Sequence, residues 1–301
     1  MRSTNSLAAA ASAFFFLLTT GPSYTTAASV CNGYSALCDK LYSNVTFIGS
    51  HDSAFDGILL VDNQFDSVAD QLSLGVRFLQ AQSHDKDGTI ELCHTSCTEE
   101  DAGSLETWLE TVVTFLEANP DEVVTLLITN GDGIDGSDFA SVFEAAGASE
   151  YAYSPSGTLT LSEWPTLGEL IDAGERLVVF MDYPAGTSVS YILPEFTSYI
   201  FETPYDVTDS TFSSCAIDRP SGASASGRMY LVNHFLDVDI FGIDIPDETA
   251  ASTTNGEASI MAQVNECNAL YARYPNFILL DWISVGDFLQ VQDYLNGVGS
   301  L

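Results

Sequence analysis

Basic side chains are scarce in this sequence, which has 8 Lys and Arg against 42 Asp and Glu and a formal net charge of −34. The imbalance argues against nucleic acid as a partner, because neutralising phosphates requires a basic face. A strongly anionic bilayer is unfavourable for the same reason, so we expect at most transient contact with a membrane surface. We interpret the acidic excess as a solvated surface rather than a site for a specific cationic partner.

Long apolar runs are also missing after residue 28, where no segment reaches the roughly 18 apolar residues of a membrane-spanning helix. Residues 1–28 have the pattern of a secretory signal peptide, with an early basic residue, an apolar stretch at 7–18 and small residues at the end. Residues 296–301 lack the hydrophobic tail of an anchor signal. We therefore predict a soluble, secreted, extracellular protein with one domain over residues 29–301.

Cysteine is infrequent, but all six cysteines lie after the predicted signal peptide, in a chain that we expect to meet an oxidising compartment. We therefore predict disulfides between local neighbours, with one distant pair left over. The predicted pairs are Cys31–Cys38, Cys93–Cys97 and Cys215–Cys267. A zinc site is the alternative, and it is disfavoured because no CxxC pair is matched by a second one.

Short apolar runs alternate with amphipathic segments along the chain. The predicted strands are 44–49, 76–82, 89–93, 123–129, 177–182, 228–235 and 277–282. The predicted helices are 64–74, 104–118, 137–146, 167–174, 257–273 and 286–296. Nearly continuous apolar strands suit parallel strands buried on both faces, so the alternation predicts an α/β protein of the (β/α)8 barrel type. A doubly wound open sheet is the alternative, although no GxGxxG motif follows the first strand.

One long segment, residues 203–226, has no clear period and is rich in Ser, Thr, Asp, Pro and Gly. We predict a loop there, closed by the Cys215–Cys267 disulfide. Long loops on a barrel often carry functional residues.

Histidine is rare too, with four in the chain, yet two of them lie at the ends of predicted strands. His51 follows the apolar run 45–50, and His94 ends another such run. Two imidazoles at one edge of a barrel can act as base and acid near neutral pH. We expect His84 to be exposed in a polar loop, and a satisfied core position is the alternative role for His234.

Further polar side chains lie at the ends of the predicted strands, at the edge where barrel active sites are found. They are Asp52, Gln80, Gln82, Asp182, Asn233 and Asp281. Polar groups at the ends of buried strands cost free energy unless they are paired or used, which makes these residues candidates for a site. For Asp182 and Asp281 the alternative is a cap on the following helix.

Four segments, in this order, resemble the X-domain-like phosphodiesterases related to phosphatidylinositol-specific phospholipase C. They are IGSHDS at 48–53, GVRFLQ at 75–80, LCHTSC at 92–97 and LLDW at 279–282. The resemblance spans about residues 45–282 and is closest to a secreted fungal branch. It implies an incomplete, distorted TIM barrel that cleaves phosphodiesters with two histidines.

The resemblance also implies a role for each of four residues. His51 matches the general base that takes the proton of the attacking hydroxyl, and His94 matches the general acid that protonates the leaving alkoxide. Asp281 matches the carboxylate that orients the base, and Asp52 matches the one that supports the acid. A carboxylate beside an imidazole fixes its tautomer and raises its pKa.

The sequence departs from the family pattern at the charge stabilisers. Gln82 stands where the bacterial branch has an arginine that stabilises the phosphoryl oxygens. Gln80 and Gln82 stand where the calcium-dependent branch has acidic ligands, and amides are poor substitutes at a hard cation. We therefore expect no metal and no other cofactor. Arg77 and Lys86 are the candidates for the missing positive charge.

The residues and the resemblance together predict a secreted phosphodiesterase that acts on a phospholipid or glycerophosphodiester, with phosphatidylinositol as the first candidate by resemblance alone. Gln80, Gln82, Asp182 and Asn233 are expected to bind the substrate. A cyclising lyase and a hydrolase both fit the sequence. The sequence also does not determine the oligomeric state. The alternative is a non-catalytic secreted barrel that binds a phosphorylated head group or glycan, which the loss of both usual charge stabilisers favours.

Overall fold

The computed structural model describes residue 1 and residues 27–301. The predicted signal peptide, residues 1–28, therefore lies almost wholly outside the described part of the chain. Within the described residues, no helix combines the length and the apolar character needed to cross a membrane. The domain boundary at residue 29 stays a prediction.

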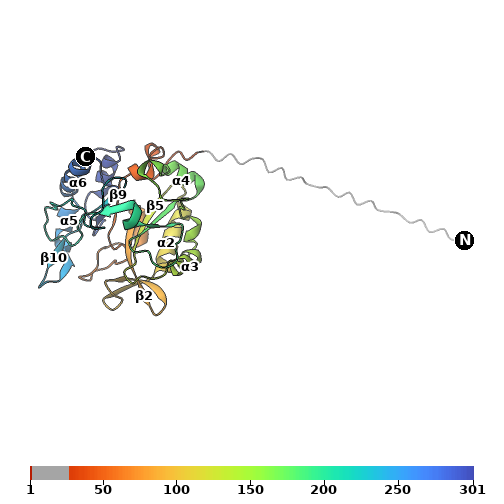
Figure 1. Cartoon of the computed structure of the whole chain (residues 1–301), viewed down its shortest axis with the longest axis horizontal. Helices are drawn as coiled ribbons and strands as arrows, with labels where there is room; N and C mark the ends of the chain where they lie inside the picture. Colours follow the sequence, from red (N-terminus) through yellow and green to blue (C-terminus); the bar gives the residue numbers. More distant parts are fainter. Residues whose placement is uncertain (2–26) are drawn as a thin grey trace.

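Eight parallel strands form one curled sheet that makes an incomplete barrel (Figure 1). In their order across the sheet they are β7 (Ile192–Pro194), β6 (Leu177–Met181), β5 (Val124–Thr129), β2 (Phe78–Lys86), β1 (Phe47–Ser50), β12 (Phe277–Leu280), β9 (Met229–Asn233) and β8 (Ile200–Glu202). The last strand, β12, pairs with the first, β1, as a barrel requires. This order confirms the predicted distorted barrel and excludes a doubly wound sheet, in which the last strand lies at an edge.

The barrel is open between β7 and β8, which are not paired in the described structure. A π-helical turn, Glu195–Tyr199, connects them. The antiparallel strands β3 (Thr89–His94) and β4 (Glu100–Ser104) extend β2, and a hairpin of β10 (Asp237–Asp239) and β11 (Asp244–Pro246) follows β9. The sequence does not indicate β4, β7, β8, β10 or β11, because these segments of three to five residues lack the continuous apolar run that marks the predicted strands.

Helices follow most of the strands and cover the outer face of the sheet (Figure 1). They are α1 (Val68–Leu74), α2 (Leu105–Ala118), α3 (Gly136–Ala145), α4 (Leu167–Ala173), α5 (Ala251–Thr254), α6 (Glu257–Tyr271) and α7 (Phe288–Leu295). The side chains of Ser67, Ser104 and Thr166 cap α1, α2 and α4. All six predicted helices are confirmed, with ends that move by a few residues, and the four-residue α5 is added.

Alternation along the strands places apolar side chains in the interior of the barrel and polar side chains at its carboxyl edge. Along β2, Leu79 belongs to the outer core, whereas Phe78 belongs to the inner core and lies 4.8 Å from the ring of Phe277. Gln80 and Gln82 follow Phe78 on the same face and line a cavity. The period of two thus leads from packed aromatic rings to polar side chains at the carboxyl edge of the sheet.

All six cysteines form disulfides, and the three predicted pairs are confirmed. They are Cys31–Cys38, Cys93–Cys97 and Cys215–Cys267. The zinc alternative is therefore wrong. The segment 203–226 contains no helix or strand, as predicted, and its disulfide ties it to α6.

Candidate active site

His51 and Asp281 meet because they follow neighbouring strands. β1 pairs with β12 with Ser50 opposite Leu280, so the next residue of each strand lies beside the other. The Nδ1 atom of His51 is 2.9 Å from the Oδ1 atom of Asp281. The side-chain amide of Asn63 donates to the same Oδ1 atom at 3.1 Å. These contacts orient the imidazole with Nδ1 toward the carboxylate and leave Nε2 for another partner.

Asp52 lies between two imidazoles. Its Oδ2 atom is 3.5 Å from Nε2 of His51 and 3.6 Å from Nε2 of His94. The side chain is fully buried, and the backbone turns there with a φ of 44°, which is uncommon for a residue with a Cβ. A carboxylate at this point favours the protonated form of His51.

His94 reaches the site from the antiparallel extension of β2. It ends β3, and the Cys93–Cys97 disulfide closes the turn that follows. Its ring meets the ring of Phe55 edge to face at 5.2 Å, and its Nδ1 atom is buried without a hydrogen-bond partner. The disulfide and the aromatic contact hold the imidazole beside Asp52.

Two side-chain amides fix Asp52 in place. Gln82 donates through Nε2 to Oδ2 of Asp52 at 2.7 Å and accepts through Oε1 from the backbone N–H of Thr95 at 3.2 Å. Gln80 accepts through Oε1 from the backbone N–H of Asp52 at 2.6 Å. Gln82 therefore links the carboxylate between the imidazoles to the turn that carries His94.

A calcium ion does not fit this set of donors. Calcium takes about six to eight oxygen ligands, several of them charged. The side-chain oxygens of Gln80 and Gln82 already accept backbone hydrogen bonds. Across residues 27–301, no group of three or more His, Cys, Asp or Glu side chains is arranged to hold a metal ion.

The pKa of His51 is set by opposing effects. Burial favours the neutral ring, but the carboxylates of Asp52 and Asp281 outweigh it and raise the pKa of His51 to about 9. Burial also raises the pKa of Asp281, an effect that the neighbouring imidazole opposes. Two carboxylates around one ring thus keep His51 protonated at neutral pH.

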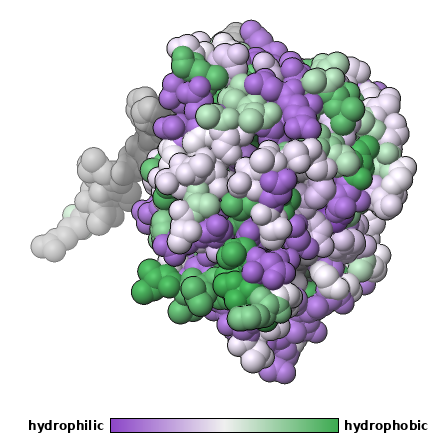
Figure 2. All heavy atoms as spheres, turned by 90° about the vertical axis from the view of Figure 1, so that its left-hand side faces the viewer, coloured by the Kyte–Doolittle hydropathy of each residue, from purple (hydrophilic) through white to green (hydrophobic). Residues whose placement is uncertain are grey.

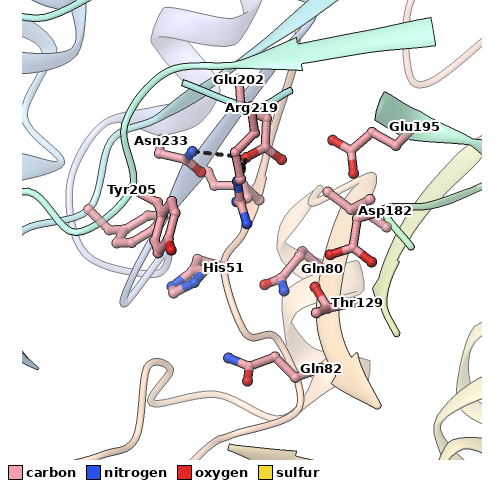
Figure 3. Close-up of a pocket in the computed structure, with 13 residues that line it drawn as sticks. His51, Gln80, Gln82, Thr129, Asp182, Glu195, Glu202, Tyr205, Arg219 and Asn233 are labelled. Atoms are coloured by element: carbon pink, nitrogen blue, oxygen red, sulfur yellow. Dashed lines mark hydrogen bonds and ion pairs between the residues drawn. The ribbon is translucent and has the colours of Figure 1, made fainter. Parts of the chain in front are cut away.

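A cavity of about 190 Å³ opens beside His51 at the carboxyl edge of the sheet (Figure 3). All four residues predicted to bind the substrate line it: Gln80, Gln82, Asp182 and Asn233. The lining further includes Thr129, Glu195, Glu202, Tyr205, Arg219 and Phe235. The cavity is therefore rich in side chains that exchange hydrogen bonds and carry charge.

A second hollow, of about 300 Å³, contains His51, Asp52 and His94 together with the base of the β10–β11 hairpin. It shares His51, Gln82, Tyr205 and Phe235 with the first cavity. The ring of Phe235 stacks on the imidazole of His51 at 3.7 Å. The two hollows thus adjoin at His51, and a ligand that fills both has its middle beside that ring.

Arg219 is a cation of the site that the sequence pattern does not indicate. It belongs to the loop 203–226, which an isolated β-bridge between Glu202 and Arg219 joins to the end of β8. The guanidinium donates through Nε to Glu202 at 2.8 Å and lies 4.2 Å from the ring centre of Tyr205. The only signals for it in the sequence are the composition of the loop and the Cys215–Cys267 pair, and neither selects a residue.

The two basic residues suggested by the sequence are wrong candidates for the site. Arg77 pairs with Glu122 at 2.7 Å, and its guanidinium lies over the ring of Phe115 on α2. Lys86 is exposed and pairs with Asp101. Neither residue lines the cavity or the adjoining hollow.

The remaining two histidines stand apart from His51 and His94. His84 lies 3.2 Å from Asp132 at the surface and lines neither hollow. His234 is fully buried, pairs through Nδ1 with the side chain of Gln263 and lies 2.9 Å through Nε2 from the carbonyl oxygen of Thr254. His234 therefore has the alternative role given above, that of a core histidine whose ring nitrogens both have polar partners.

Neither Asp182 nor Asp281 caps a helix, because no helix begins directly after either residue. Asp182 instead accepts hydrogen bonds at Oδ1 from the backbone N–H groups of Asn130 at 2.9 Å and Tyr183 at 2.7 Å. Asp281 turns to His51. Both carboxylates therefore face the carboxyl edge of the barrel, where the cavity lies.

Comparisons with known proteins identify the family. The family model described as PI-PLC X 1 matches residues 37–296. The chain belongs to the PI-PLC X family. A PI-PLC X domain-containing protein 1 from Arthroderma benhamiae is 50% identical over 275 residues, which cover 89% of this chain and 90% of that relative. A protein of the same fungus that is named an uncharacterized secreted protein is 40% identical over 286 residues, which cover 89% of this chain and 64% of that relative.

Solved PI-PLC structures share the fold of this PI-PLC X chain. The phosphatidylinositol-specific phospholipase C of Listeria monocytogenes has a TM-score of 0.57 at 13% identity, with coverage of 92% of this chain and 100% of that one. A phosphatidylinositol-specific phospholipase C of S. aureus has a TM-score of 0.57 at 16% identity, with coverage of 88% and 95%. At these identities the likeness shows the distorted barrel alone.

Proposed function

We propose that this PI-PLC X chain is a secreted phosphoric diester hydrolase or lyase, with His51 as general base and His94 as general acid. Its substrate is a phospholipid or glycerophosphodiester, and phosphatidylinositol is the candidate that the family name suggests. The observation that carries the proposal is Oδ2 of Asp52, within 3.6 Å of Nε2 of both rings. Cleavage of a diester needs a base and an acid at one phosphorus, and the shared carboxylate supports that arrangement.

The two imidazoles divide the proton transfers. Neutral His51 takes the proton of the attacking hydroxyl at Nε2, while Asp281 holds Nδ1 and stabilises the imidazolium that forms. His94 gives a proton to the leaving alkoxide. Because the pKa of His51 is raised to about 9, only a small fraction of the rings is neutral at pH 7, so turnover is expected to rise with pH.

N–H donors, in place of a metal ion, stabilise the negative charge on the phosphoryl oxygens. Figure 3 shows the guanidinium of Arg219 directed into the cavity on the side of His51. Its Nε and Nη2 atoms engage Glu202, which leaves Nη1 for the substrate. A guanidinium fixed before the reaction stabilises developing negative charge without reorganising.

Apolar side chains at the rim support a lipid substrate. The loop after β1 exposes Ile58, Leu59 and Leu60, and the β10–β11 hairpin after β9 exposes Phe241 and Ile243. Because β1, β12 and β9 are parallel neighbours, both segments leave the same edge of the barrel as the site. Figure 2 shows apolar side chains gathered in a protruding patch on one face of the molecule. Such a rim suits a substrate that is presented in a lipid layer.

Three observations support secretion. The residues before the domain have the pattern of a signal peptide, all six cysteines are in disulfides, and a relative is named a secreted protein. Disulfides persist in oxidising compartments.

A panel of phosphodiesters, assayed with and without excess chelator, tests the proposal. We expect cleavage of at least one lipid or glycerol diester, at a rate that chelator does not change. Phosphorus NMR identifies the product, because a neighbouring hydroxyl as nucleophile gives a cyclic diester and water gives a monoester. Complete loss of activity in chelator, restored by calcium, would contradict the metal-free mechanism.

A non-catalytic barrel that binds a phosphorylated head group is the second candidate. Arg219 is engaged by Glu202 and Gln82 by Asp52, so two of the donors at the site are partly occupied, which favours this candidate. It predicts binding of phosphorylated ligands without cleavage of any diester in the panel. Turnover of one substrate decides against it.

A further inference from the structure

The end of the cavity away from His51 is lined by carboxyl side chains. Glu195, Glu202 and Asp182 are 0%, 2% and 5% exposed. They come from the π-helical turn, the end of β8 and the end of β6, and all three line the cavity. Figure 3 shows the carboxyl groups of Glu195 and Asp182 directed into the cavity from the same side.

One cation is not enough to balance these three groups. Arg219 donates through both Nε and Nη2 to Glu202. Asp182 receives two backbone N–H groups at Oδ1. Both carboxyl oxygens of Glu195 are buried and accept no hydrogen bond from an N–H or O–H group, and only in its protonated form does Glu195 bond to Glu202. A buried carboxyl group that faces a cavity and has neither a cation nor an N–H donor of its own costs free energy, and a cationic donor on a ligand would satisfy it in place of the proton shared with Glu202.

The pKa values of Glu195 and Asp182 reflect the shortage of positive charge. Burial, with the charge of Glu202 and a hydrogen bond to it, raises the pKa of Glu195 well above its usual range, and burial raises the pKa of Asp182 to about 6. A raised pKa favours a proton on Glu195 in the absence of a second cation. A ligand that brings a positive charge would replace the proton on Glu195.

We propose that this end of the cavity is a subsite for a primary ammonium group on the head group of the substrate. The inference rests on the proposed diesterase function, because the subsite shares its cavity with His51. An ammonium group has three N–H donors, enough for both oxygens of Glu195 and for Asp182. A metal ion is a poorer occupant, since the described residues include no convergent group of three acidic, His or Cys ligands.

The charge of the whole molecule favours the same ligand. A head group that carries ammonium beside the phosphodiester is net neutral, whereas a polyol phosphodiester is anionic. A chain with a formal net charge of −34 repels an anionic ligand and not a neutral one. An ammonium group on the ligand is therefore favoured both by the local carboxyl groups and by the negative field of the whole molecule.

A matched pair of substrates tests the subsite. Glycerophosphoethanolamine and the ester in which a hydroxyl replaces its ammonium have nearly the same shape, and we expect kcat/KM to favour the first by about 10- to 100-fold. Glu195→Gln keeps the shape and neutrality of the protonated side chain, so the fold is retained and the preference falls to near one. Glu117→Gln, on the exposed face of α2, changes the formal charge equally and leaves the preference intact. Intact lipids with the same two head groups, in vesicles, distinguish a lipid source from a soluble diester.

Calorimetry gives a readout that does not need turnover. With the His94→Ala protein, binding of glycerophosphoethanolamine at pH 7 is expected to release protons, seen as a binding enthalpy that depends on the ionisation enthalpy of the buffer. The hydroxyl analogue releases none, and Glu195→Gln abolishes the release.

The outcomes separate the two proposals. Cleavage of both diesters at equal kcat/KM, unchanged in Glu195→Gln, would overturn the ammonium subsite and leave the diesterase standing, with a proton shared by Glu195 and Glu202 as the occupant. Calcium binding that is lost in Glu195→Gln would also overturn it. Proton release on binding, without cleavage of any diester, would support the subsite and overturn the diesterase.

Discussion

The carboxylate of Asp52 contacts two imidazoles and one side-chain amide and is not exposed to solvent. Its Oδ2 atom lies within 3.6 Å of the Nε2 atoms of His51 and His94, and it also accepts from Gln82 at 2.7 Å. Asp281 adds a second carboxylate on His51 alone. The two rings are therefore unequal, since His51 has two carboxylate neighbours and His94 has one.

The first residue-scale prediction concerns the pH dependence of Asp281→Asn. Removing an anion beside His51 destabilises the imidazolium, so the pKa of His51 falls from about 9 and the neutral base appears at lower pH. The acidic limb of the kcat/KM profile is expected to move to lower pH, while the plateau drops about 10-fold or more because the ring loses its orientation. Steady-state kinetics from pH 5 to pH 10 check this, with Glu117→Gln as control. An unmoved acidic limb would assign that limb to another group.

Sequence reasoning finds some residues of the site and misses others for a physical reason. His51, His94 and Asp281 lie at the ends of apolar strands, so barrel topology brings them to one edge. Arg219 lies in a loop without a period, and a disulfide and an isolated bridge place it. No local pattern encodes contacts of that kind.

At the scale of elements, the long strands and helices follow from periodicity, whereas the short strands do not. β6 has five consecutive buried apolar residues and is found within one residue of its predicted end. β7 and β8 have three residues each and close the barrel only in part. Glu195, which lies between them, can be placed only once the gap in the barrel is known.

Two disulfides hold elements of the site, and we expect the loss of each to have a different effect. The Cys215–Cys267 bond spans 52 residues, so replacing both cysteines with serine is expected to cost about 2–4 kcal/mol of unfolding free energy. The Cys93–Cys97 bond spans four residues beside His94, so its loss is expected to lower kcat about 10-fold with little change in Tm. Thermal denaturation and kinetics of the two double variants check the contrast. Equal losses of Tm would contradict it.

At the scale of the whole molecule, the protein is strongly acidic but exposes an apolar rim at the edge of the barrel that holds the site. The net charge of −34 opposes approach to an anionic bilayer, whereas exposed side chains such as Phe241 at the hairpin tip favour insertion into a lipid layer. Together these properties predict a preference for a zwitterionic surface over an anionic one. The charge is read directly from the sequence, but the rim is not, because its apolar residues come from loops that only the fold brings to one edge.

The rim predicts a difference between lipid and soluble substrates. Leu60→Ser combined with Phe241→Ser is expected to lower turnover on zwitterionic vesicles about 10-fold or more, since each exposed side chain loses its burial in lipid. Turnover of a soluble monomeric diester is expected to stay unchanged. Leu270→Ser, an exposed leucine on α6, is the matched control. Equal losses on both substrates would place the effect in the site itself.

The central claim is that His51 and His94 are the acid–base pair of a metal-free diesterase. Its most direct test is turnover of one cleaved diester by the wild-type, His51→Ala and His94→Ala proteins, followed by phosphorus NMR in excess chelator. Circular dichroism and Tm establish that the variants are folded. We predict full activity in the wild type and a loss of about 100- to 10,000-fold in each variant. Near-wild-type turnover in either folded variant would contradict the account.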